Sequence, residues 1–186
     1  WPAGWTTGWP KARNMIMIEV ATQMTCLDEL YLKMVDYYAD DPARIQHFVK
    51  VHSFAALIGR QEGLDPQTQQ TLEAAALVHD IGIKPAEAQY HSSDGRYQEQ
   101  LGPTPAREMV LSCGFAPAVA DRVAWLVGHH HTYTAIDGPD YQILVEADFL
   151  VNLYEDGVPR SAARHALEHI FRTPTGTALC KTMFGL

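Results

Sequence analysis

The chain has 186 residues, of which 47% are hydrophobic and 19% are charged, and its formal net charge is -8. This size and composition are typical of one globular domain and exclude a long disordered or low-complexity protein. No stretch reaches the roughly 20 apolar residues of a membrane span, and the acidic balance excludes stable nucleic-acid binding through many phosphate contacts. The three cysteines are far apart, which argues against a disulfide scaffold, so we expect a cytoplasmic protein.

The periodicity of the sequence predicts an all-α fold. Residues 1–14 show neither helical nor strand periodicity, and we interpret them as an irregular N-terminal extension. Residues 15–186 are expected to form a single domain, because apolar residues recur at helical spacings between Asp-Pro, Gly and Pro signals, and no alternating run predicts a strand. Helices are expected over residues 16–38, 42–61, 66–80, from 103 or 105 to 112, 116–128, 139–155, 160–171 and 174–183, with residues 86–102 irregular. Gly82 and Pro85 are expected to close the helix over 66–80.

Four side chains with metal-binding chemistry fall on the apolar faces of these predicted helices. His47 lies in the middle of the apolar stripe of its helix and is expected to point into the core. His79 and Asp80 follow an almost wholly apolar run, residues 74–78, and Asp148 has apolar neighbours at helical spacings. A core histidine with one satisfied hydrogen bond would explain His47 alone, but two buried carboxylates are costly unless they are paired or bind a cation.

Two imidazoles and two carboxylates suit a divalent transition metal, and we expect Mn, Fe, Co, Ni or Zn as cofactor. Gathering the four side chains around one cation would offset the cost of burying both aspartates. The alternative is a network of Asp-His and Asp-Arg pairs without a metal.

The order of these residues resembles the H…HD…D signature of the HD-domain metal-dependent phosphohydrolase superfamily. The resemblance covers about residues 41–155, with His47, the run from Ala76 through His79-Asp80 to Gly82, and Asp148 in a late helix. It implies a helical bundle of the HD-domain type, in which His47, His79, Asp80 and Asp148 bind one divalent metal. Asp80 would also act in catalysis, by bridging to a second ion or contacting the attacking water.

A second metal ion is a further expectation from the resemblance. His129-His130-His131 follows a predicted apolar helix, and binuclear members place extra histidines between the HD pair and the last Asp. A solvated histidine cluster is the alternative, and among the three we favour His129 and His130. His91, in the segment predicted to be irregular, is another candidate, and a mononuclear site is favoured if it only lies in a surface loop.

Phosphoryl transfer also requires local positive charge. Lys50, three residues after His47, and Lys84, four after Asp80, are candidates to bind a substrate phosphate, with Arg96 as a weaker choice; each is otherwise an ordinary solvated cation. Some nucleotidases of the superfamily carry an acidic proton donor four residues after the HD aspartate, where this chain has Lys84. Lys84 is therefore a candidate catalytic residue by position. The identity of the general acid is left open, and Glu87 is the nearest carboxylate in the sequence. Tyrosines at 90, 97 and 133 are candidates to stack a base, or else pack half-buried.

Together these features predict a metal-dependent phosphohydrolase that acts on a nucleotide or another small phosphorylated metabolite through a metal-activated water. The segment from His91 to Gly102 is a candidate lid over the site. Two alternatives stay open: a di-iron oxygenase, which would need the histidine cluster and His91 as ligands, and a non-catalytic metal or nucleotide sensor.

Overall fold

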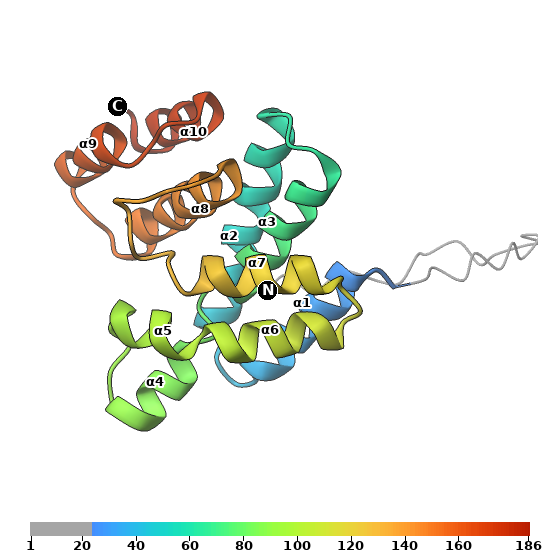
Figure 1. Ribbon diagram of the computed structural model, residues 1–186. Coiled ribbons are helices and arrows are strands. Elements are labelled where there is room, and N and C mark those ends of the chain that lie inside the picture. Colours follow the sequence, from blue (N-terminus) through green and yellow to red (C-terminus); the bar gives the residue numbers. More distant parts are fainter. Residues whose placement is uncertain (1–23) are drawn as a thin grey trace, which may run out of the picture.

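The computed structural model describes residues 24–186. The predicted extension over residues 1–14 and the beginning of the first predicted helix lie outside this range. The part of the chain that the structure describes contains ten helices and no strand, which confirms the all-α prediction (Figure 1). The helices are α1 (Cys26–Tyr37), α2 (Pro42–Gln61), α3 (Pro66–Val78), α4 (Ile83–Tyr90), α5 (Gly95–Leu101), α6 (Pro103–Ser112), α7 (Pro117–Val127), α8 (Pro139–Glu155), α9 (Arg160–His169) and α10 (Pro174–Phe184).

Most helices begin where local sequence chemistry predicts. Asp41 caps α2 by accepting a hydrogen bond from the Arg44 backbone N–H, at 3.1 Å, and Pro42 occupies the first turn. Asp65 and Pro66 play the same parts in α3. Such caps satisfy backbone donors that have no partner within the helix, and proline loses nothing there because its missing N–H would be unpaired anyway.

The segment predicted to be irregular, residues 86–102, is instead largely helical, because α4 and α5 occupy most of it. Pro85 does not close the preceding helix; it lies in the first turn of α4, where proline is tolerated. Asp94 caps α5. A Cβ on Gly82 would lie 2.6 Å from the carbonyl oxygen of Gln98, so α5 packs against the turn after α3 only because a glycine is there.

The helices pack around one hydrophobic core that places α2, α3 and α8 side by side. α2 contacts both α3 and α8, and α3 also contacts α7 and α8. α9 and α10 cover the outer side of α8, whereas α4 and α5 lie at the opposite end of the molecule (Figure 1). Within residues 24–186 no helix is long and apolar enough to cross a membrane.

Glu146 of α8 joins the C-terminal helices to the core. Its side chain is fully buried and accepts hydrogen bonds from the backbone N–H groups of Arg172, at 2.6 Å, and Thr173, at 2.9 Å. The Thr173 hydroxyl and the Gln142 side-chain amide also donate to it. The carboxylate therefore satisfies the donors of the turn between α9 and α10 from the core side.

Replacing Glu146 by alanine should destabilise the fold, because it leaves four part-buried donors without their acceptor. We expect a loss of roughly 2–4 kcal/mol in the free energy of unfolding, measured by urea denaturation. Glu168→Ala, on the exposed side of α9, is the matched control and should change it by less than about 0.5 kcal/mol. Equal effects of the two substitutions would show that Glu146 does not anchor the α9–α10 turn.

Candidate metal centre

The three adjacent helices bring the four predicted ligands together. His47 lies on α2 and Asp148 on α8, while His79 ends α3 and Asp80 lies in the tight turn that follows. The turn is held by hydrogen bonds from the Ile81 N–H to the Val78 carbonyl and from the Ile83 N–H to the Asp80 carbonyl, both 2.9 Å long. This sharp change of direction makes two consecutive residues, His79 and Asp80, face the same point.

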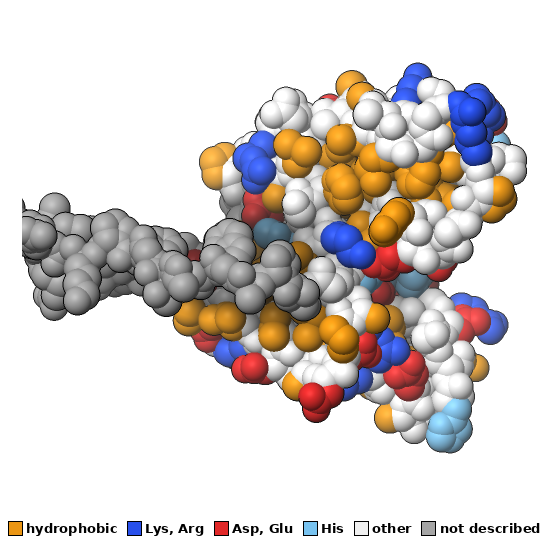
Figure 2. Space-filling view, turned by 180° about the vertical axis from the view of Figure 1, so that it is seen from behind, with side chains coloured by type: hydrophobic (Ala, Val, Ile, Leu, Met, Phe, Trp, Pro, Cys, Tyr) orange, Lys and Arg blue, Asp and Glu red, His pale blue; other side chains and the backbone are white. Residues whose placement is uncertain are grey.

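The ligand atoms of these residues are close to one another. His47 Nε2 lies 3.2 Å from His79 Nε2 and 3.2 Å from Asp148 Oδ1. Asp80 Oδ2 lies 3.5 Å from each of the two imidazole Nε2 atoms, and His79 Nε2 is 3.6 Å from Asp148 Oδ1. We call His47, His79, Asp80 and Asp148 the four-donor group. On the surface, Figure 2 shows histidine and acidic side chains in a hollow with a basic side chain at its rim.

Hydrogen bonds on the far side of each imidazole fix which nitrogen faces the group. His79 Nδ1 lies 2.9 Å from the Ala76 carbonyl and His47 Nδ1 lies 2.8 Å from Glu155 Oε2, and both oxygens only accept hydrogen bonds. Each Nδ1 therefore carries a proton, which leaves the Nε2 lone pair of a neutral ring directed at the group. The sequence analysis does not predict a role for Glu155. It lies seven residues after Asp148, two helical turns along the same face of α8, and this spacing is the signal that could have indicated it.

A second group adjoins the first and shares Asp80 with it. Asp80, His130 and His131 each offer a ligand atom, and these three atoms lie within 4.8 Å of one another. Asp80 Oδ1 lies 3.5 Å from His130 Nε2, whereas its Oδ2 faces His47 and His79. The two oxygens of one carboxylate thus face different groups, the geometry of a bridging ligand.

The Nε2 atoms of His130 and His131 are buried without a hydrogen-bond partner. Buried polar atoms are normally satisfied, and an unsatisfied nitrogen beside a carboxylate points to a group bound between them. His130 Nδ1 lies 2.9 Å from the Val127 carbonyl, which fixes its tautomer in the same way as that of His79. The donor set and these two orphaned nitrogens both fit a bound cation.

Side chains from two other helices hold the histidine loop in place. Glu99 of α5 accepts hydrogen bonds from the His131 N–H, at 3.0 Å, and from the Thr132 hydroxyl, at 3.1 Å. The Tyr141 hydroxyl of α8 lies between the carbonyls of His129 and Thr132. The segment that the sequence analysis treated as a candidate lid therefore supplies, through α5, a fixed support for His131.

The electrostatics of the four-donor group follow from burial and close contact. Burial disfavours the charged form of His79, but Asp80 and Asp148 outweigh it and raise its pKa to about 9. Burial also opposes ionisation of Asp148, yet hydrogen bonds from His47 and His79 hold its pKa well below the usual range. The pKa of Asp80 is likewise lowered, chiefly by the charge of His79 against the effect of burial. Without a cation, protons on the imidazoles compensate for the two carboxylates.

His131 differs from the other imidazoles in its charge state. Burial lowers its pKa to about 4, and the neighbouring His130 adds to the effect. His131 is therefore neutral at pH 7 and presents an unprotonated nitrogen, the form that binds a metal.

Two of the predicted second-metal ligands lie elsewhere. His129 stacks on Trp125, with ring centroids 4.1 Å apart, and its Nδ1 contacts the Trp125 carbonyl at 2.6 Å, so it belongs to neither group. His91 is exposed at the C-terminal end of α4, where its backbone is left-handed with φ 53°. His131, which the sequence analysis did not favour, takes the place expected of His129; consecutive histidines after a helix carry no periodicity that would distinguish them.

The predicted cationic residues differ in how they relate to the site. The Lys50 ammonium pairs with Glu155, the carboxylate that holds His47 from its Nδ1 side. Lys84 instead donates to the Tyr37 carbonyl at the end of α1 and lies over the rings of Tyr37 and Tyr38, so it faces α1. Arg96 is exposed and pairs with Asp94, the residue that caps α5.

The side chains that sequence analysis considered for a general acid or for base stacking also have other partners. Glu87 forms a two-pronged pair with the guanidinium of Arg44, at 2.6 and 3.1 Å. The rings of Tyr90 and Tyr97 stack on each other, and that of Tyr133 packs against Phe149.

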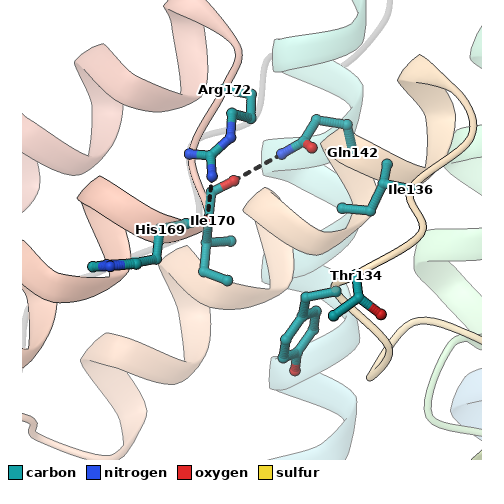
Figure 3. Close-up of a pocket in the computed structure, with 7 residues that line it drawn as sticks. Thr134, Ile136, Gln142, His169, Ile170 and Arg172 are labelled. Atoms are coloured by element: carbon teal, nitrogen blue, oxygen red, sulfur yellow. Dashed lines mark hydrogen bonds between the residues drawn. The ribbon is translucent and has the colours of Figure 1, made fainter.

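A separate pocket of about 230 Å³ opens beside the start of α8 (Figure 3). Its lining includes Arg172, whose guanidinium already donates to the backbone carbonyls of Glu168, His169 and Phe171 at the end of α9. Gln142 donates to the Ile170 carbonyl on the same side. These polar groups hold the turn together, and the four-donor group lies outside this pocket.

The comparison with known proteins agrees with this geometry. The family model of the HD domain matches residues 44–169, which include both candidate groups. This chain belongs to the HD-domain family. It is also similar to a crystal structure described as a predicted HD superfamily hydrolase from an uncultured Thermotogales bacterium. The two share 26% sequence identity and a TM-score of 0.62, and the match covers 92% of each chain. No curated protein matches the sequence. The chain is thus an HD superfamily member, with a predicted hydrolase among its structural relatives and a buried His/Asp cluster consistent with metal binding.

The metal-free protein should lose stability as the pH rises from 6.5 to 9. The raised pKa of His79 contributes stability that is complete below its ordinary value of 6.5 and is lost as the pH passes about 9. The lowered pKa values of the two aspartates and of His131 add little to the change in stability between pH 6.5 and 9, because these groups titrate at lower pH in the folded protein. We expect the melting temperature of chelator-treated protein to fall by roughly 2–4 °C or more.

The same pH scan with a divalent cation present is the control. A cation would take the place of the imidazole protons, so its stabilising effect should grow with pH. A melting temperature of the metal-free protein that rises between pH 6.5 and 9 would contradict the proposed charge balance.

Proposed function

We propose that this chain is a metal-dependent phosphohydrolase that acts on a nucleotide or another small phosphorylated metabolite. The observation that carries the proposal is the convergence of His47, His79, Asp80 and Asp148, in which each imidazole Nε2 lies 3.2–3.6 Å from the other imidazole and from both carboxylates. Membership of the HD-domain family and the resemblance to a predicted hydrolase support it.

His47, His79 and Asp80 offer ligand atoms within 4.8 Å of one another and so fit one divalent ion, with Asp148 Oδ1 beside both imidazoles, and Asp80, His130 and His131 fit a second. Mixed imidazole and carboxylate donors suit Mn, Fe, Co, Ni or Zn rather than Ca or Mg. A divalent ion bound there would polarise a phosphoryl oxygen and lower the pKa of a water molecule towards neutrality.

The protein's own side chains would orient the reaction. Glu155 and the Ala76 carbonyl keep His47 and His79 in the tautomer that presents Nε2. Asp80 serves both groups through its two oxygens. Lys50 is linked to this arrangement through its pair with Glu155, and we assign it to phosphate binding. Lys84 and Arg96, which face α1 and Asp94, are not part of the proposed machinery.

The alternatives make different predictions about iron and turnover. The di-iron oxygenase would need His91 as a ligand, and His91 is exposed at the end of α4. The group of Asp80, His130 and His131 is the place where a second ion would bind in either enzyme. Bound iron with oxygen consumption would favour the oxygenase. Tight metal binding without turnover of any phosphoester would favour a sensor.

Asp80→Ala should abolish both metal binding and hydrolysis, because it removes a ligand from each group. We expect turnover of p-nitrophenyl phosphate or its bis ester, after reloading with Mn, Co or Ni, to fall by about 10³-fold or more. Metal content by mass spectrometry should fall with it. Full activity and unchanged metal content in this folded variant would refute the site.

A pair of neighbouring histidines tests the second ion. His130→Ala should lower the metal stoichiometry from two towards one, because it removes an orphaned nitrogen that faces Asp80. His129→Ala, one residue away but stacked on Trp125, is the matched control and should leave the stoichiometry unchanged. A loss of metal with His129→Ala and none with His130→Ala would reverse the assignment of the loop.

A further inference from the structure

An apolar pocket of about 340 Å³ lies between α2, α8 and α10, on the flank of the metal centre. Its volume falls within the range of small-ligand pockets, roughly 300–1,000 Å³. Its lining is largely apolar, apart from one serine and one lysine. The lining residues are Lys50, Ser53, Phe54, Leu150, Val151, Tyr154 and Met183.

Apolar side chains around this pocket are exposed to an unusual degree. Tyr154 is 69% exposed, Met183 41% and the neighbouring Leu57 of α2 38%. Figure 2 shows hydrophobic side chains gathered on the upper part of the face, above the hollow that holds the histidine and acidic side chains. Contiguous exposed apolar surface with a concave centre is typical of a binding site.

The pocket shares helices α2 and α8 with the four-donor group. Lys50 lines the pocket and lies one helical turn after His47 on α2, and Val151 lies one turn after Asp148 on α8. The Lys50 ammonium pairs with Glu155, which holds His47, and lies 5.8 Å from the centre of the Tyr154 ring. A positive charge therefore separates the cluster of metal-binding residues from an apolar wall that carries an aromatic face.

We propose that this pocket binds an aromatic ring of the substrate, while its phosphate lies at the metal centre. The assignment rests on the proposed function and narrows it to phosphate esters that carry an aromatic group, as opposed to small sugar phosphates. Lys50 would contact the phosphate, and Tyr154 and Met183 would cover the ring. An aromatic ring fits the pocket volume of about 340 Å³. Because Lys50 lines this largely apolar pocket, the pocket suits a ligand that is anionic at one end and apolar at the other.

The test compares two non-hydrolysable ligands that differ only in the ring. Isothermal titration calorimetry of the Mn-loaded full chain should show 1-naphthylmethylphosphonate binding about tenfold more tightly than methylphosphonate, because the ring gains contact with the pocket. Tyr154→Ala should remove most of this difference, and Tyr154→Phe should retain it. Leu32→Ala, which truncates a 53% exposed residue of α1, is the control and should leave it unchanged.

A second measurement separates this inference from the hydrolase proposal. Binding of neutral 1-naphthol to the metal-free chain should also be lost in Tyr154→Ala, whether or not the protein hydrolyses any phosphoester. Absence of all turnover would refute the hydrolase and leave this binding in place. Equal affinity for the two phosphonates, or equal effects of Tyr154→Ala and Leu32→Ala, would overturn the pocket assignment. A dimer in sedimentation that Met183→Glu dissociates would also overturn it, by showing that a second copy of the chain covers this surface.

Discussion

The structure depends on two carboxylates at the junction of α2, α3 and α8, of which Asp148 is buried and Asp80 is half-buried. Asp80 and Asp148 are held where water solvates them poorly, and an ionised carboxylate in such a place is stable only beside positive charge or strong donors. The imidazoles of His47 and His79 supply that compensation in the metal-free chain by carrying protons. A divalent cation, as proposed above, would do the same with more charge and without protonation of the imidazoles.

The surroundings of the centre are specialised to keep these side chains in one orientation. Backbone carbonyls accept hydrogen bonds from the Nδ1 atoms of His79 and His130, and the Glu155 carboxylate accepts one from Nδ1 of His47. Glu99 of α5 accepts a hydrogen bond from the His131 backbone N–H. Four separate segments thus converge on the histidines, and the rigidity of the site comes from the packing of whole helices rather than from any one loop.

Much of the fold could be predicted because its signals are local. Asp41-Pro42 and Asp65-Pro66 mark helix starts through side-chain caps, and the apolar stripe around His47 indicates its inward face. The resemblance to the HD family added the relation between His79-Asp80 and Asp148, which periodicity alone does not give. The prediction is wrong for α4 and α5, because Pro85 lies in the first turn of α4 and does not end the helix before it.

The details of the second group could not be read in the same way, since they depend on tertiary contacts. Which of the three consecutive histidines faces Asp80 is decided by the stacking of His129 on Trp125 and by the hold of Glu99 on the next turn. Likewise, only the folded chain reveals that Lys84 faces α1 and that Lys50 pairs with Glu155.

The division of Asp80 between two groups has a consequence for how ions would load. Because one carboxylate serves both positions, the first ion to arrive would withdraw electron density from the oxygen left for the second, and the two ions would also repel each other. The two dissociation constants are then linked, with a tight first step in the group of four donors and a weaker later one beside His130 and His131. Such a centre would be half-filled when metal is scarce and complete only when it is plentiful, so the supply of metal in the cell would set which form is present.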